Sequence, residues 1–138
     1  MSSVALPADV RSVEVVLPHD VSAVSDARRG LNDYLRRYEV PVDRRDDARL
    51  VLSELLSNAI RYAPPLSSGD LRVSWWIDPR GIHIEVTDGC GESEPQHITG
   101  ADPEALGGRG LAIVTVLTSS WGVRQRDGSR TVFAVLPH

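Results

Sequence analysis

Apolar and polar residues alternate along several short stretches of the chain, and this period of two is typical of strands that bury one face. The stretches that show it are 10–17, 71–77, 82–86, 121–126 and 130–136. Asp78–Gly81 has the proline and glycine of a tight turn between the second and third stretches, and Asp127-Gly128 joins the last two into a hairpin. The pattern therefore predicts a sheet with one buried face and one partly open face.

Three other stretches have apolar residues three and four apart, which is the period of an amphipathic helix. They are 22–38, 43–63 and 110–119. Ser22 or Ser25 is a candidate cap for the first helix and Asp43 for the second, and prolines at 41 and 64–65 mark where the first two helices end. Such helices bury one stripe each and would cover the closed face of the sheet. We therefore expect one domain over 1–138 with a two-layer α/β architecture.

The composition limits the classes of function. The 138 residues are 41% hydrophobic and 25% charged, as in an ordinary soluble domain, and the net charge of −4 argues against direct nucleic-acid binding. No apolar run approaches the roughly 20 residues of a membrane span, and the N-terminus has no signal-peptide pattern. The single cysteine fits a cytoplasmic location. All 15 basic residues are arginine, which excludes a P-loop because that motif needs lysine.

The segment 54–63 places an acid and an amide one turn apart on the second helix. Glu54 and Asn58 share a helix face, which Arg61 continues. Any amphipathic helix has a polar face, so a purely structural explanation stays open. Asn58 is nevertheless a poor helix former. An amide there suits an oxygen ligand for Mg²⁺, and Glu54 is a candidate base for an attacking hydroxyl.

The segment 86–91 ends the third stretch with an acid and two glycines. Asp88 lies at the end of the expected strand, before Gly89 and Gly91. Because Asp-Gly is a common turn pair, a simple turn is one explanation. In the other, the Asp88 carboxylate accepts a hydrogen bond from an exocyclic amine such as that of adenine, and the glycines let the base approach the backbone closely.

The segment 107–110 opens the third helix with three glycines around Arg109. The free N–H groups and the positive dipole end of a helix start form a ready phosphate site. A flexible joint between loop and helix explains the glycines equally well. Arg109 is a phosphate contact in the first case and a solvated charge in the second. The preceding residues, 91–107, have no period and predict a mobile loop.

The order and spacing of these three motifs resemble those of the GHKL (Bergerat-fold) ATPases, which include the ATP domains of histidine kinases. The resemblance covers nearly the whole chain and extends to Thr131, which matches a family threonine beside the adenine-binding aspartate. It implies a mixed, mostly antiparallel sheet with about three helices on one face, a disordered 1–9 and an ATP lid at 91–107. The stand-alone length and Trp121-Gly122 make the chain similar to anti-sigma-factor serine/threonine kinases of the RsbW/SpoIIAB type.

The resemblance also implies roles for the motif residues. ATP and Mg²⁺ are the implied cofactors, with Glu54 as general base, Asn58 as Mg²⁺ ligand and Asp88 as the adenine contact. The other implied cofactor-binding positions are Arg61, Gly89, Gly91, Gly108, Arg109, Gly110, Leu111 and Thr131.

The implied function is that of an ATP- and Mg²⁺-dependent regulator that sequesters a sigma factor and phosphorylates a STAS-domain anti-anti-sigma partner. Two departures from the family pattern leave a second class open. Tyr62-Ala63-Pro64 stands where related kinases have His-Gly, and Ala105-Leu106 stands where their lid has an arginine. A partner-binding module without kinase activity is that alternative. An accessory ATPase domain of a split sensor kinase is a third.

The first helix is a candidate partner surface. Its four arginines, at positions 28, 29, 36 and 37, form either a contact for an acidic protein or a solvated charged face. Homologous kinases usually dimerise, so both a monomer and a homodimer stay open. Neither nucleic acid nor a membrane is expected as a direct partner.

Overall fold

The computed structural model describes residues 12–89, 97–99 and 110–138. Its elements, in chain order, are β1 (Val13–Pro18), α1 (Ser22–Arg37), α2 (Val42–Tyr62), β2 (Asp70–Asp78), β3 (Gly81–Asp88), β4 (His97–Thr99), α3 (Gly110–Leu117), β5 (Ser120–Arg126) and β6 (Ser129–Leu136). The segment 1–9 and most of the expected lid, 91–107, lie outside the described residues.

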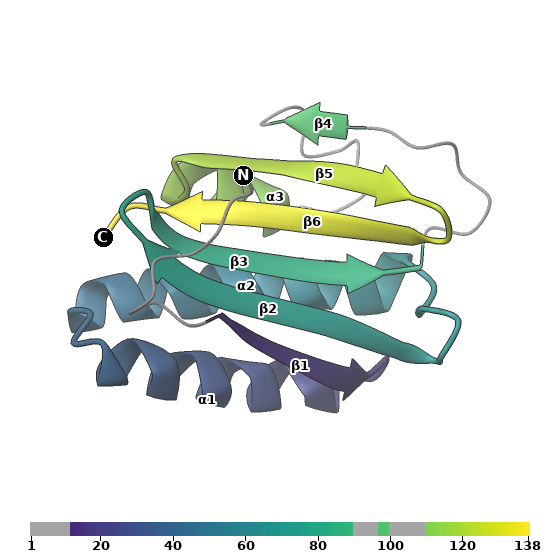
Figure 1. Ribbon diagram of the computed structural model, residues 1–138, viewed down its shortest axis with the longest axis horizontal. Helices are drawn as coiled ribbons and strands as arrows, with labels where there is room; N and C mark the ends of the chain where they lie inside the picture. The colour runs from purple at the N-terminus through teal and green to yellow at the C-terminus, as the bar shows by residue number, and fades with distance from the viewer. Residues whose placement is uncertain (1–11, 90–96, 100–109) are drawn as a thin grey trace.

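The described strands form one six-stranded sheet in the order β1-β2-β3-β6-β5-β4. Every described pair is antiparallel, where a mixed sheet with mostly antiparallel pairs was expected. Figure 1 shows α1, α2 and α3 together on one side of this sheet. The expected two-layer α+β sandwich is thereby confirmed, and β3 and β6 lie at its centre.

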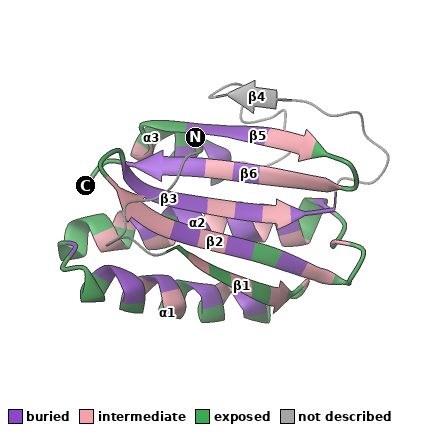
Figure 2. Ribbon diagram, viewed as in Figure 1, coloured by how far each residue is buried: buried purple, intermediate pink, exposed green. Residues whose placement is uncertain are grey.

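The core lies between the sheet and the helices. On β3, Ile82, Ile84 and Val86 are fully buried, and Leu52 and Leu56 of α2 are fully buried opposite the sheet (Figure 2). Each such side chain contributes about 1.5–3 kcal/mol through removal from water. Because side chains alternate along a strand, the same parity that buries Val86 also places the last residue of β3 on the helix-facing side.

Three local expectations are wrong. Residues 97–99 pair with β5 as a short strand, inside a stretch expected to be an irregular loop. The first helix takes its capping contact from Asp20, whose Oδ1 accepts a hydrogen bond from the Ser22 N–H at 2.7 Å, and not from Ser22 or Ser25. In α2 the capping position is occupied by Pro41, and Asp43 lies in the first turn.

No helix among the described residues combines the length and apolar character needed to cross a bilayer.

Candidate functional site

Asp88, the last residue of β3, is fully buried on the helix-facing side of the sheet. Its strand neighbour in register is Arg130 of β6, and the Arg130 Nη2 donates a hydrogen bond to Asp88 Oδ2 at 3.1 Å. The other carboxylate oxygen, Oδ1, has no hydrogen-bond partner within the described structure. A buried carboxylate oxygen without a partner is costly, so this atom marks a position where a ligand donor would be favourable.

The environment of Asp88 also changes its protonation. Burial raises the pKa of this carboxyl to about 6, and the positive charges of Arg130 and, more weakly, His19 limit that rise. The carboxylate is therefore mostly ionised at neutral pH, although it is held in a place that disfavours its charge. Perturbed groups of this kind are common at functional sites.

A small cavity joins Asp88 to the second helix. It is lined by Leu55, Asn58, Ala59, Asp88, Leu111, Arg130 and Val132. Three of these side chains, from α2, β3 and β6, each carry a buried polar atom without a partner in the described part of the chain: Asn58 Nδ2, Asp88 Oδ1 and Arg130 Nε. Unpaired donors and an unpaired acceptor around one cavity suit a polar ligand. The free volume is only about 10 Å³, which is room for about one water molecule.

The family model for histidine kinase-like ATPase domains matches residues 17–136, which is most of the chain. The chain belongs to this family. It is also 35% identical, over 52 residues, to the phosphate regulon sensor protein PhoR of Pseudomonas aeruginosa strain PAO1. That match covers 38% of this chain and 11% of the sensor protein, so the chain spans a small part of that relative.

Histidine kinase-like ATPase domains imply ATP binding, commonly with Mg²⁺, and α2 carries the first residues expected to serve it. Asn58 lines the cavity beside Asp88. Glu54 lies one turn earlier, half-buried, and has no hydrogen-bond or ion-pair partner among the described residues. Arg61 does not reach the cavity, because its exposed guanidinium lies 5.8 Å from the ring centroid of Tyr62. The structure therefore brings Asn58 to Asp88, keeps Glu54 nearby and places Arg61 outside.

The expected phosphate-binding segment is described only in part. Gly110 begins α3, as expected, and Leu111 is buried in the first turn and lines the cavity. Gly91, Gly108 and Arg109 lie outside the described residues. The N-terminal end of α3 therefore lies beside the Asp88 cavity, where a helix start is suited to an anion.

The expected role of Thr131 needs correction. In the antiparallel register Thr131 is opposite Thr87, and their hydroxyl oxygens are hydrogen-bonded at 2.8 Å on the open face of the sheet. Asp88 faces the helices, so the residue of β6 that meets it is Arg130. The sequence analysis missed Arg130, although a signal was present. Arg130 is two residues from the buried Val132 and therefore lies on the same face of the strand.

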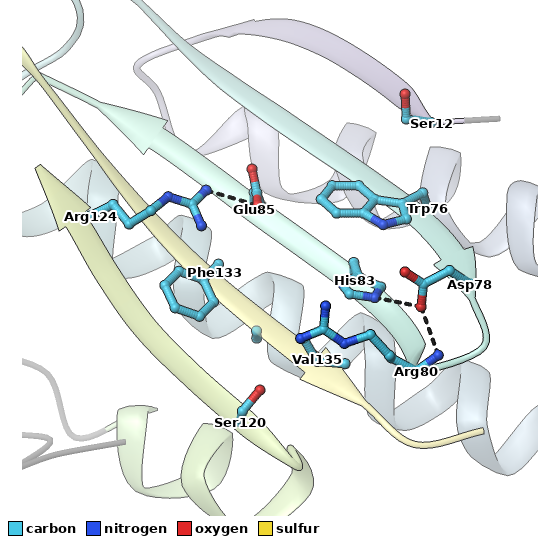
Figure 3. Close-up of a pocket in the computed structure, with 11 residues that line it drawn as sticks. Ser12, Trp76, Asp78, Arg80, His83, Glu85, Ser120, Arg124, Phe133 and Val135 are labelled. Atoms are coloured by element: carbon cyan, nitrogen blue, oxygen red, sulfur yellow. Dashed lines mark hydrogen bonds and ion pairs between the residues drawn. The ribbon is translucent and has the colours of Figure 1, made fainter. Parts of the chain in front are cut away.

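A larger hollow, of about 460 Å³, lies on the open face of the sheet (Figure 3). Its acidic groups already have partners: Asp78 Oδ1 is hydrogen-bonded to His83 Nε2 at 2.8 Å, and Glu85 Oε2 accepts from Arg124 Nη2 at 3.0 Å. The His83 ring also stacks on the Trp76 ring, with 4.7 Å between the ring centroids. None of the buried polar atoms that lack a partner within residues 12–89, 97–99 and 110–138 belongs to this lining. The chemistry that calls for a ligand is therefore in the smaller cavity around Asp88.

Gly89 has a packing role that the sequence did not predict, and its expected role in shaping an adenine pocket stays a prediction. It is buried, and its N–H donates a hydrogen bond to Pro64 O at 2.9 Å, which ties the end of β3 to the segment after α2. A Cβ at this position would overlap the carbonyl oxygen of Pro65. The same segment is tied to the start of the domain through Ala63 O, which accepts from His19 Nε2 at 2.7 Å.

Gly89→Ala should therefore lower the free energy of unfolding by about 2 kcal/mol, because either the Pro64–Pro65 backbone or the end of β3 has to shift. Urea unfolding of the variant and the wild type checks this. Equal midpoints and slopes would show that this contact is easily relaxed.

Proposed function

We propose that this chain is an ATP- and Mg²⁺-dependent regulator that sequesters a sigma factor and phosphorylates a serine or threonine of a STAS-domain anti-anti-sigma partner. Family membership supports the nucleotide part of this proposal. The finer part rests on the resemblance of the three motifs to the anti-sigma-factor kinases. The observation that supports ATP most strongly is the fully buried Asp88, whose Oδ1 lacks a partner and which shares a cavity with Asn58.

The residues present fit an adenine nucleotide. The unpaired Asp88 Oδ1 would accept a hydrogen bond from the exocyclic amine of the base, while Leu55, Leu111 and Val132 would contact its faces. The Asn58 amide would hold Mg²⁺ through its oxygen, and the start of α3 would face the phosphates. Bound Mg²⁺ supplies charge neutralisation on the phosphates.

The chain's own contribution to transfer would be positioning and proton removal. Glu54, one turn from Asn58, would take the proton of the partner's hydroxyl, because its carboxylate is half-buried and is not paired with any described residue. The backbone N–H groups at the start of α3 would hold the nucleotide in place. Phosphoryl transfer depends largely on such positioning and electrostatic stabilisation.

A second candidate function is a nucleotide-dependent clamp that holds a partner without transferring phosphate. It is favoured by the two departures from the kinase pattern. Tyr62-Ala63-Pro64 stands where related kinases have His-Gly. Within it, the Ala63 carbonyl accepts a hydrogen bond from His19 and the Pro64 carbonyl accepts one from the Gly89 N–H. The segment therefore has a structural task here, and Ala105-Leu106 supply no arginine to the lid.

We propose that the first helix, α1, carries the surface that binds the protein partner. Arg28, Arg29, Arg36 and Arg37 are all exposed on α1, and Arg29 lies 3.6 Å from Asp26 in a weak surface pair. Such a face suits an acidic protein surface. Whether a neighbouring gene encodes a sigma factor or a STAS-domain protein is the cheapest observation that bears on this assignment.

Asp88→Asn should weaken ATP binding about tenfold to a hundredfold, because a hydrogen bond to a charged acceptor is worth about 1.5–3 kcal/mol. Isothermal titration calorimetry with ATP and Mg²⁺ measures this. Glu85→Gln is the matched control, since it neutralises a carboxylate of the same strand on the opposite face of the sheet. Equal ATP affinity in wild type and Asp88→Asn would contradict the adenine assignment.

The two candidate functions differ in one assay. The purified chain is incubated with γ-labelled ATP, Mg²⁺ and a STAS-domain protein, taken from a neighbouring gene where one encodes it. Label on a serine or threonine of that protein supports the kinase. Bound ATP with no transferred label supports the clamp.

A further inference from the structure

Arg130 pairs with the carboxylate that would receive a base, and this pairing is incomplete. Among the described residues, Arg130 bonds to the carboxylate through one nitrogen, Nη2, and to one oxygen, while its Nε is buried without a partner there. A two-bond fork between guanidinium and carboxylate would satisfy both oxygens. Here one oxygen of Asp88 and one nitrogen of Arg130 are left over, so the pair is weaker than its burial suggests.

The cavity has to enlarge before any purine can enter, because it has room for about one water molecule. Most of its lining cannot move cheaply. Leu55, Ala59, Leu111 and Val132 belong to the closely packed core and are at most 6% exposed. Displacing one of them would open a void in the core.

Arg130 is different in two respects. Its side chain is 18% exposed, whereas that of Asp88 is not exposed at all. It is also the second residue of β6, next to the turn at Gly128, which has a positive φ of 73°. A long side chain at the end of a hairpin can reach water by changing rotamers, without moving the core.

We propose that Arg130 is a displaceable gate of the base subsite: its guanidinium holds Asp88 while the site is empty and leaves the carboxylate when the purine binds. The inference rests on the proposed ATP site and adds how its affinity is set. With the gate closed, Asp88 has a cationic partner and the cavity is too small for a ligand. With the gate open, both carboxylate oxygens face the base, and Arg130 is solvated.

A closed gate lowers the apparent affinity, since the binding constant is reduced by the fraction of molecules in the open state. Arg130→Thr removes the gate and keeps a small polar side chain at this position. The variant should therefore bind ATP about tenfold more tightly than the wild type. Loss of the arginine raises the pKa of Asp88 further. Calorimetry is therefore carried out at about pH 8.5, so that Asp88 is ionised in both proteins.

Arg124→Thr is the matched control. Arg124 lies on the neighbouring strand β5 and pairs with Glu85 at 3.0 Å, but on the open face of the sheet. Its removal also deletes one arginine from an arginine–carboxylate pair and one positive charge. ATP affinity equal to that of the wild type is expected, which separates the gate from a general effect of charge.

A second measurement uses the wild type alone, so that it does not depend on the folding of a variant. Nitrogen-15 NMR follows the Arg130 Nε–H, which is buried in the empty protein. Its exchange with water should become faster when ATP is added. Exchange that stays unchanged on saturation with ATP would overturn the gate.

The outcomes also separate this inference from the proposed function. If the wild type binds ATP, Asp88→Asn binds it more weakly, and a folded Arg130→Thr binds it no better than the wild type, the gate is wrong and the ATP site stands. Weaker binding by Arg130→Thr would assign Arg130 to the base contact instead. If neither the wild type nor Arg130→Thr binds ATP, both the site and its gate are wrong.

Discussion

Glu54→Gln should bind ATP with the affinity of the wild type and transfer phosphate to its protein partner about 10²- to 10⁴-fold more slowly, which is the usual contribution of a general base. The glutamine keeps the size and the hydrogen-bonding capacity of the side chain, but it cannot take a proton at neutral pH. Glu54 is not among the side chains that line the cavity, so nucleotide contacts should survive. Single-turnover transfer of γ-labelled phosphate, beside calorimetry with ATP, measures the two effects separately.

Asp47→Asn is the control for this prediction. Asp47 lies two turns before Glu54 on the same face of α2 and is also half-buried, so the variant removes an equivalent negative charge. It should leave both ATP binding and transfer unchanged. A Glu54→Gln protein that transfers at the wild-type rate would show that another group takes the proton, or that transfer needs no base from α2.

The architecture could be predicted from the sequence because local pattern and tertiary structure agree. The alternation of Ile82, Ile84 and Val86 gives both the strand and its buried face, and in the structure Asp88 continues the same parity on the side of the helices. The polar Asn58 on an otherwise well-packed helix was also a usable signal. Where each level of the sequence points to the same answer, prediction is straightforward.

The errors have physical causes as well. A three-residue strand such as β4 has almost no local signal, because its pairing with β5 comes from tertiary contact. Choosing Thr131 instead of Arg130 is an error of one residue, and one residue exchanges the two faces of a strand. The contact of Gly89 with Pro65 joins segments more than 20 residues apart, which spacing within one motif does not reveal.

The burial of Asp88 lowers the stability of the fold. Asp88 is fully buried, it has one orphaned oxygen, and its only hydrogen bond among described side chains comes from Arg130. A buried carboxylate with one partner stabilises a fold less than an apolar side chain of similar size would. The position of a carboxylate on this central strand is explained if its unpaired oxygen binds a ligand.

The free energy of unfolding of the wild type, relative to that of Asp88→Asn, should fall by about 2.4 kcal/mol as the pH rises from about 4 to about 7. The pKa of Asp88 is raised from its usual 3.8 to about 6 by burial, against the opposing charges of Arg130 and His19. Between these two values the folded protein keeps the proton, whereas the unfolded chain has released it. Raising the pH therefore favours the unfolded state, until Asp88 is ionised in both states.

Asparagine does not titrate, and the variant keeps both Arg130 and His19, so the difference between the two proteins isolates Asp88. Urea unfolding at a series of pH values gives that difference, provided that the slopes agree. Asp78→Asn supplies a control of opposite sign. Burial favours the neutral form of Asp78, but hydrogen bonds from His83 and the Arg80 N–H prevail and lower its pKa.

Asp78 therefore stabilises the folded state above its unfolded pKa, and this stabilisation is lost as the pH falls. The stabilisation from Asp88 is present at low pH and is lost as the pH rises. A difference between wild type and Asp88→Asn that stays constant from about pH 4 to 7 would mean that Asp88 is ionised throughout, with a normal pKa. The buried, half-paired carboxylate would then carry no strain for a ligand to relieve, and the main physical support for a nucleotide at Asp88 would be lost.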